Sequence, residues 1–268
     1  MKEDQPMSNA DVVVELAEGV CRITLNRPDA ANAINLTVAR KLLAAAIRCN
    51  QDSAIRVVVL TGTGRMFCAG GDLKEMAQQK DQLPGGLKEL TVYLHAALAH
   101  FARMEKPLLN AVNGAAAGAG VSLALVGDIV LAASSASFTL AYAAAGLVPD
   151  GSATFFLPRL IGLRRTQELM FTNRRLKAGE AMDWGMITRV VPDDTLAAEV
   201  ADLARTLATG PTRAFGIAKR LLCSSLANSL ETQMELESRA IAEVAQTHDG
   251  REGIAAFLEK RPAHFVGR

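Results

Sequence analysis

The sequence has little excess charge of either sign, and this already limits the classes of partner. Among its 268 residues, 29 are lysine or arginine and 28 are aspartate or glutamate, which gives a formal net charge of +1. A chain this close to neutral has no general field that would gather polyanions, so we expect no binding to nucleic acid or to an anionic membrane surface. Any phosphate-bearing ligand would have to be held by a few local cations.

Cysteine and histidine are also scarce, at four residues each. Cys21, Cys49, Cys68 and Cys223 form no C-x-x-C pair and have no histidine at metal-ligand spacing, so neither a zinc site nor a disulfide framework is expected. The first ten residues are polar and acidic, unlike a secretory signal peptide. We therefore expect a cytoplasmic protein that holds no metal.

Long hydrophobic runs without polar residues are missing too. The most apolar stretch, residues 107–126, reads PLLNAVNGAAAGAGVSLALV and contains the small-residue pair Gly114 and Gly118, as a membrane helix dimer can. Two asparagines and a serine interrupt it, however, and much of the rest is alanine and glycine, which gain little on transfer to lipid. We predict a buried strand followed by a buried helix.

What the sequence does contain is an alternation of strand and helix patterns without a linker or a repeat of fixed period. The apolar periodicity predicts strands at 12–16, 20–25, 57–60, 108–112 and 129–132. It predicts helices at 36–48, over about 17 residues ending at 103 after a Pro-Gly-Gly loop, from about 118, at 166–171 and 195–207, and two more after 211. We therefore expect one α/β unit, with a core at 1–195 and a helical part at 196–268.

The first segment with chemical potential is MFCAGGDLKE, residues 66–75, directly after a predicted buried strand. Its small residues Ala69, Gly70 and Gly71 allow backbone N–H groups to approach a ligand, and Asp72 can cap a helix over residues 73–77. The segment could bind an oxygen anion. It could equally be a glycine-rich turn, because short glycine motifs often occur without a function.

A second glycine segment, NGAAAGAGVS at residues 113–122, also follows a predicted strand and opens a predicted helix. N–H groups at such a helix start lack intrahelical acceptors and favour negative charge. Two loops of this kind could converge on one oxygen atom.

The third segment, GLVPDGS at residues 146–152, places Asp150 in a turn with apolar residues on both sides. If this surrounding excludes water, the carboxylate is strengthened as a general base. Taken alone, an aspartate between proline and glycine is more often an ordinary turn or capping residue.

Together these segments resemble the crotonase family, also called the enoyl-CoA hydratase and isomerase family. The likeness extends over nearly the whole chain, through ITLNRP (23–28), FCAGGDLKE (67–75), AVNGAAAGAG (111–120) and FLEKR (257–261). It implies a spiral of strand-strand-helix repeats with a helical C-terminal region for oligomerisation and CoA covering, as a homotrimer or a dimer of trimers. It further implies an acyl-CoA thioester as substrate and no separate cofactor, as in fatty acid or phenylacetate metabolism.

The resemblance also implies roles for individual residues. The oxyanion hole would consist of the backbone N–H groups of Gly71 and Ala119. The substrate and its CoA moiety would lie against residues near the glycine loops and near the C-terminus, the latter from this or a neighbouring subunit: Arg27, Ala31, Ala33, Ala69, Asp72, Leu73, Lys74, Tyr142, Phe257 and Lys260.

The sequence departs from the hydratases at their two catalytic glutamates, where Ser122 and Tyr142 stand instead. A hydroxyl group is no substitute for a carboxylate base at neutral pH, so ordinary two-glutamate hydration is disfavoured, although a hydratase stays an alternative. The context GLVPD resembles the branch of ring-epoxide phenylacetyl-CoA isomerases, in which an aspartate at this place moves protons. One carboxylate suffices for that reaction, so we predict a double-bond isomerase with Asp150 as base.

The aryl-CoA dehalogenases offer a second likeness. In that branch an aspartate at the place of Asp150 is the nucleophile, a histidine at the place of His95 activates water, and a tryptophan stands where Tyr142 is. The absent tryptophan and Gly71, where a bulky aromatic residue would line an aryl pocket, weigh against dehalogenation. A lone histidine such as His95 on an apolar helix is otherwise expected to be a satisfied core residue.

Three other functions receive less support. VVVLTGTGRMF, residues 57–67, lacks the third glycine of a dinucleotide-binding turn. GVSLA around Ser122 lacks the second glycine of a nucleophile elbow. A non-catalytic acyl-CoA-binding protein that has lost its glutamates is the third, and the presence of Asp150 argues against it.

Overall fold

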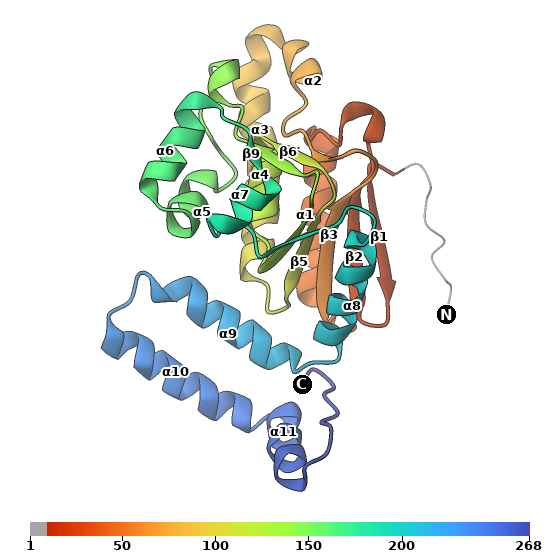
Figure 1. Cartoon of the computed structure of the whole chain (residues 1–268), viewed down its shortest axis with the longest axis vertical. Helices are drawn as coiled ribbons and strands as arrows, with labels where there is room; N and C mark the ends of the chain where they lie inside the picture. The colour runs from red at the N-terminus through yellow and green to blue at the C-terminus, as the bar shows by residue number, and fades with distance from the viewer. Residues whose placement is uncertain (1–9) are drawn as a thin grey trace.

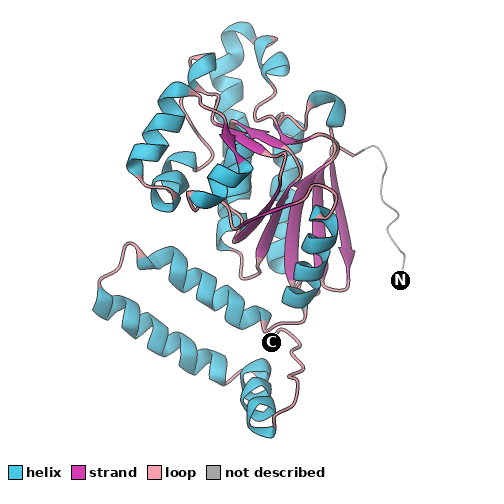
Figure 2. Cartoon of the chain, viewed as in Figure 1, coloured by secondary structure: helices cyan, strands magenta, loops and turns pink. Residues whose placement is uncertain are grey.

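Two β-sheets form the centre of the molecule. The computed structural model describes residues 10–268, and within them one sheet has six strands and the other has four (Figures 1 and 2). The larger sheet contains, in spatial order, β1 (Val12–Ala17), β2 (Val20–Leu25), β3 (Val57–Gly62), β5 (Leu108–Val112), β7 (Ile129–Ala133) and β10 (Arg189–Val191). The smaller sheet contains β4 (Met66–Cys68), β6 (Ala115–Ala117), β8 (Ser137–Thr139) and β9 (Leu176–Lys177).

The chain advances through both sheets together. β3, β5 and β7 are parallel neighbours in the larger sheet, and each is followed after a few residues by β4, β6 or β8, which are parallel neighbours in the smaller one. The predicted spiral of strand-strand-helix turns is therefore present. The helices of the spiral are α1 (Leu36–Gln51), α2 (Leu73–Ala77), α3 (Leu83–Arg103), α4 (Ala119–Leu125), α5 (Ala153–Leu160), α6 (Leu163–Thr172) and α7 (Ala178–Asp183).

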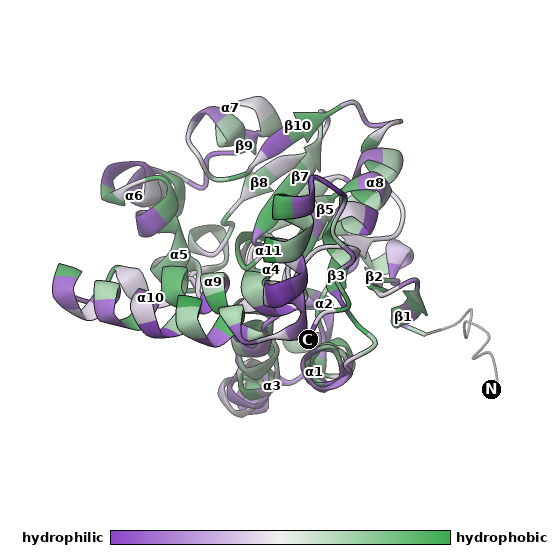
Figure 3. Ribbon diagram, turned by 90° about the horizontal axis from the view of Figure 1, so that it is seen from below, coloured by the Kyte–Doolittle hydropathy of each residue, from purple (hydrophilic) through white to green (hydrophobic). Residues whose placement is uncertain are grey.

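The core lies around the larger sheet. Every residue of β5 is buried, as are the first four of β3, and Figure 3 colours these strands mostly as hydrophobic. A strand covered on both faces needs such a continuous apolar run. α1 packs against α3 with its apolar face, and the Asn35 side chain accepts a hydrogen bond of 2.9 Å from the Val38 amide, as predicted for its cap.

The C-terminal helices differ in how they pack. α8 (Leu196–Ala208) lies against β3, β5 and β7 of the larger sheet. α9 (Thr212–Ser225) contacts α3, and α10 (Leu230–Ala245) contacts α9 and α11 (His248–Glu259). Figure 1 shows these last three helices beneath the sheets, with α11 at the end farthest from α2. The sequence predicted two helices after residue 211, and the structure has three.

The start of α3 and the most apolar stretch of the chain were also predicted from the sequence. The Pro-Gly-Gly segment was expected to be a loop, but it forms the first turn of α3. Proline is tolerated there because N–H groups in the first turn of a helix have no acceptor within the helix, so the missing N–H costs no hydrogen bond. Residues 107–126 form β5, β6 and α4. The expected strand and helix are both present, and β6 is an additional short strand between them. Between residues 10 and 268 no helix combines the length and the apolar character needed to span a bilayer. The segment judged unlike a signal peptide falls almost entirely outside the described residues.

Candidate active site

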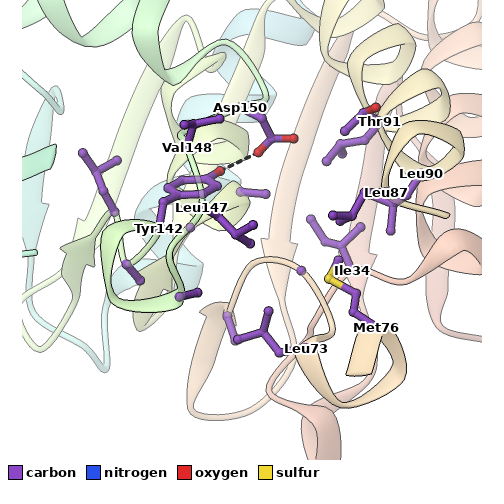
Figure 4. Close-up of a pocket in the computed structure, with 18 residues that line it drawn as sticks. Ile34, Leu73, Met76, Leu87, Leu90, Thr91, Tyr142, Leu147, Val148 and Asp150 are labelled. Atoms are coloured by element: carbon purple, nitrogen blue, oxygen red, sulfur yellow. Dashed lines mark hydrogen bonds between the residues drawn. The ribbon is translucent and has the colours of Figure 1, made fainter. Parts of the chain in front are cut away.

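A cavity of about 240 Å³ lies where the two glycine loops meet the Asp150 turn. In Figure 4, Tyr142 and Asp150 face it from one side, while Leu87, Leu90 and Thr91 of α3 face it from the other. Asp150 is the one charged residue in the described lining, which is otherwise mostly aliphatic. The lining consists of Ile34, Ala69, Gly71, Leu73, Met76, Leu87, Leu90, Thr91, Leu94, Gly118, Ala119, Leu140, Ala141, Tyr142, Ala145, Leu147, Val148 and Asp150.

The two glycine loops touch one another at the cavity wall. Gly70 has φ +89°, a conformation that residues with a side chain rarely adopt. A Cβ atom there would lie 2.7 Å from the Ala117 carbonyl oxygen and 3.1 Å from the Ala119 nitrogen. Glycine at this position therefore allows the loop after β4 to approach the start of α4.

The amides of Gly71 and Ala119 are available for a ligand. Both residues line the cavity, and neither N–H has a hydrogen-bond acceptor within residues 10–268. Ala119 is the first residue of α4, so its N–H points away from the helical hydrogen-bond ladder. The structure thus brings both amides predicted for the oxyanion hole to the cavity that Asp150 also lines.

Asp150 is held by three other polar groups. The Tyr142 hydroxyl donates to Asp150 Oδ1 over 2.6 Å, and His95 Nε2 lies 3.2 Å from Asp150 Oδ2 (the tyrosine bond is drawn in Figure 4). The Ser122 hydroxyl donates to the Asp150 carbonyl oxygen over 2.9 Å, and the Gly151 amide donates to His95 Nε2 over 3.1 Å. Contacts from three separate segments of the chain therefore hold Asp150, two at its carboxylate and one at its main-chain carbonyl.

Burial decides which of these groups can carry charge. Burial, reinforced by the negative charge of Asp150, raises the pKa of Tyr142 above its usual range, so the phenol remains a neutral donor. The side chain of Asp150 is 27% exposed, so its surroundings exclude water only in part. The side chain of His95 is 48% exposed. The expectation that His95 is a core residue is therefore wrong, because its side chain lines a cavity bounded by α3, α5 and α9 instead of packing in the core.

The residues predicted to bind CoA form a connected group beside the first glycine loop. Arg27 donates to Asp72 Oδ2 over 3.0 Å and to the Ala33 carbonyl over 2.7 Å, and the Ala69 amide donates to the Ala31 carbonyl over 3.0 Å. Asp72 also caps α2 as predicted, by accepting from the Glu75 amide over 3.2 Å. These bonds hold the loop in place.

The remaining predicted residues lie at the margin or elsewhere. Leu73 lines the cavity, whereas Lys74, also in α2, is exposed. Phe257 in α11 is 84% exposed, and neither it nor Lys260 lines the cavity of its own chain. Ser122 is fully buried beneath the Asp150 turn and does not line the cavity.

Cys68 is the one thiol next to the first glycine loop, and the structure argues against a nucleophilic role for it. The residue is fully buried, and burial raises the pKa of its thiol to about 12. The thiol therefore stays protonated at neutral pH, whereas the thiolate is the reactive form.

Several lining residues were not identified from the sequence. Thr91 carries a hydroxyl at the cavity, and Met76 contacts the position that a Gly71 side chain would occupy. Neither has a neighbouring motif that distinguishes it from an ordinary helical residue. Leu147 and Val148, the apolar residues before Asp150, could have been assigned to the cavity wall, because ligand pockets are lined mainly by hydrophobic side chains.

Known proteins similar to this chain carry out several different reactions. The sequence profile "Enoyl-CoA hydratase/isomerase" matches residues 15–268. The chain is 40% identical to a 1,2-epoxyphenylacetyl-CoA isomerase of Escherichia coli (strain K12), over 96% of this chain and 98% of that protein. It is 41% identical to a probable enoyl-CoA hydratase of Rhodobacter capsulatus, with 98% and 100% covered.

Two further similarities concern another reaction and the fold. The chain is 35% identical to 4-chlorobenzoyl coenzyme A dehalogenase-2 of an Arthrobacter species, over 94% of this chain and 93% of that one. A crystal structure of a putative enoyl-CoA hydratase/isomerase from Mycobacterium abscessus superposes with a TM-score of 0.92 at 33% identity, with 96% of this chain and 100% of that one covered.

Proposed function

Since the chain belongs to the enoyl-CoA hydratase/isomerase family, a family of enzymes that act on CoA thioesters, we propose that it isomerises the double bond of an enoyl-CoA. The observation that carries this proposal is the cavity in which two free amides and one carboxylate meet. The carboxylate is Asp150, and the amides are those of Gly71 and Ala119. The largely aliphatic lining favours an uncharged, apolar acyl group.

The proposed reaction needs one base and one site for negative charge. With the thioester oxygen held by the Gly71 and Ala119 amides, Asp150 removes a proton from a carbon next to the double bond, and the electron pair moves onto the thioester oxygen. Each preorganised donor stabilises this enolate by about 3 kcal/mol. Asp150 then returns the proton to the carbon at the other end of the conjugated system, and the double bond has moved.

The contacts of Asp150 fit this role. Tyr142 keeps its proton and so holds Oδ1 without competing as a base. No arginine or lysine pairs with Asp150 in the described part of the chain, so no permanent cation stabilises its charged form. A carboxylate without such a partner is better able to accept and release a proton in turn.

The CoA moiety is proposed to lie along the group around Arg27 and Asp72, outside the cavity mouth.

Phe257 and Lys260 would then come from a neighbouring subunit of a homotrimer or a dimer of trimers. The exposed apolar side chains of α10 and α11, Leu230, Ile241, Phe257 and Leu258 among them, support such an association. Light scattering measures the assembly, and a monomer at micromolar concentration would contradict it. A cytoplasmic location stays a prediction.

Dehalogenation of an aryl-CoA is the second candidate, and the contact between His95 and Asp150 favours it. Asp150 would attack the aryl carbon and displace the halide, and His95 would activate the water that releases the product. Tyr142 in place of a tryptophan disfavours this function. Hydration requires a second carboxylate, whereas Asp150 is the single carboxylate in the described lining of the cavity.

A panel of substrates separates these functions. The enzyme is incubated with 3-enoyl-CoA, with 2-enoyl-CoA and with a 4-chloroaryl-CoA, and the products are identified by mass spectrometry and chloride release. We expect a moved double bond as the main product. A 3-hydroxyacyl-CoA as the main product would establish a hydratase instead, and chloride release would establish a dehalogenase.

A further inference from the structure

A second cavity, of about 610 Å³, lies behind Asp150 and is bounded by α3, α5 and α9. His95 lines this cavity and does not line the first one, whereas Asp150 lines the first and not the second. Their contact of 3.2 Å is therefore a polar connection between the acyl cavity and a separate space. Cavity volume alone carries no function, but this pair places a titratable group on each side of one wall.

His95 Nε2 lies within hydrogen-bond distance of both the Gly151 amide and Asp150 Oδ2. The Gly151 amide donates to Nε2 over 3.1 Å, which uses the lone pair of a neutral ring. Such a nitrogen has no proton to donate to Asp150 Oδ2, and two acceptors at 3.2 Å repel one another. Once Asp150 has taken a proton onto Oδ2, the carboxylic acid can compete with the Gly151 amide for this lone pair and donate to it.

Oδ2 is also the oxygen through which Asp150 can exchange a proton. Oδ1 accepts the Tyr142 hydroxyl, whose proton is held firmly because burial raises the pKa of this phenol. When an acyl group fills the first cavity, it displaces the water that otherwise reaches Asp150 from that side. His95, half exposed on the other side, then remains in contact with water.

We propose that His95 acts through Asp150 by exchanging its proton with water in the second cavity. The inference rests on the proposed function, in which Asp150 accepts a proton from the acyl group. The Gly151 amide gives up its hydrogen bond to Nε2, and the carboxylic proton on Oδ2 passes to the freed lone pair, which leaves a carboxylate and an imidazolium. The imidazolium exchanges its N–H protons with water, and a solvent proton returns from Nε2 to Oδ2 before Asp150 delivers it to carbon.

Charged residues of both signs lie around the second cavity. Its cationic residues are Arg103 and Arg159, and Asp150 is the carboxylate in contact with the ring. Arg159 is a residue of α5, and its side chain folds back along that helix, where it donates to the Phe155 carbonyl over 2.9 Å and lies over the Phe155 ring. The carboxylate that the proton leaves stays in contact with the ring, so the imidazolium can return a proton to Oδ2.

The deuterium content of the isomerised product in deuterated water tests this relay. The wild type should place solvent deuterium at the newly protonated carbon. In His95→Gln, the side-chain amide can still accept from Gly151 and donate to Asp150, but it cannot carry a proton. We expect turnover to fall by about threefold and the deuterium content per turnover by about tenfold, both well below the loss of about 100-fold expected when a general base is removed.

His100→Gln is the matched control, because it makes the same change on the same helix at a residue that lines neither cavity. Its turnover and deuterium content should equal those of the wild type. In His95→Ala, added imidazole should restore the deuterium content, since the second cavity has room for the ring. A structural role of His95 alone would change stability and rate but not the isotope content.

The outcomes separate the relay from the proposed function. A wild type that moves the double bond without taking up deuterium overturns the relay and leaves the isomerase in place. Equal deuterium content in wild type and His95→Gln overturns the relay too. A wild type that neither moves a double bond nor exchanges a carbon-bound proton overturns both.

Discussion

Two aspartates border the same site, and their surroundings are opposite in kind. Asp72, after the first glycine loop, pairs with Arg27 at 3.0 Å and caps α2. Asp150, in the turn after residue 146, contacts the neutral Tyr142 hydroxyl and the His95 ring, which can be neutral or charged. Both side chains are well ordered by hydrogen bonds, so order alone does not distinguish them.

The difference lies in the charge of the partners. Asp72 contacts a permanent cation and a backbone donor, and these charge-assisted contacts suit a structural role in holding the loop. Asp150 has partners that hold its position without fixing its charge, which suits proton transfer. The pair therefore shows how one loop-rich site can contain a structural and a reactive carboxylate within the same fold.

The largest expected effect comes from exchanging Asp150 for asparagine. Asp150→Asn should lower turnover by about 100-fold or more, the scale of a lost general base. An amide at this position can still accept from Tyr142 and donate to His95, so the fold and the binding of CoA should persist. Asp72→Asn, as the matched variant, should lower turnover by no more than about tenfold. Steady-state kinetics and calorimetric CoA binding measure both.

The comparison would break if the two variants behaved alike. Equal turnover in Asp150→Asn and the wild type would remove Asp150 as the base. A loss of about 100-fold in Asp72→Asn with intact CoA binding would mean that the structural carboxylate, and not only the free one, enters the chemistry.

Next in size is the effect of removing one amide donor. Gly71→Pro deletes the N–H and should lower turnover by about 100-fold, as for the loss of one oxyanion donor. Gly71→Ala keeps the N–H, and its methyl group would displace only the tip of the flexible Met76 side chain. A correctly folded Gly71→Pro enzyme with the rate of Gly71→Ala would contradict the oxyanion role.

A smaller effect sharpens the structural role of Asp72. Asp72→Ala removes both the cap of α2 and the pair with Arg27, and the free energy of unfolding should fall by about 1 kcal/mol. Asp72→Asn keeps the capping oxygen and should lose less. Chemical denaturation measures both values. An unchanged stability in Asp72→Ala would show that the loop is held by other contacts.

The smallest expected effect appears only at alkaline pH. Because the pKa of Tyr142 is raised in the folded state, its contribution to stability is complete below about pH 10 and is lost as the pH rises further. The stability advantage of the wild type over Tyr142→Phe should therefore shrink above about pH 10. The chain has two tyrosines, so ultraviolet difference titration against Tyr142→Phe resolves this phenol. Ionisation at or below its usual pKa would contradict the proposed neutral donor.

Much of the fold could be predicted because its longer elements carry clear periodicity. The apolar face and the Asn35 cap identified α1, and the continuous apolar run identified β3. The short strands β4, β6 and β8 were not assigned individually, since three residues are too few to show a period. β6 consists of three alanines and is a strand only because it pairs with β4 and β8.

The site was only partly readable. The glycine loops and Asp150 were named because each interrupts a pattern, and their resemblance to one enzyme family is confirmed by the comparisons with known proteins. The contacts of the Asp150 carboxylate with Tyr142 and His95 were not predicted, because they depend on how the chain packs in three dimensions. His95 in particular lies 55 residues away in the chain, and its exposure depends on how α9 packs beside α3.

A crystal structure with a bound, slowly reacting acyl-CoA tests the account most directly. It should place the thioester oxygen about 3 Å from both the Gly71 and the Ala119 nitrogens, with a carbon next to the double bond within reach of Asp150 Oδ2. A thioester oxygen that contacts neither amide, or an Asp150 carboxylate directed away from the acyl group, would contradict it.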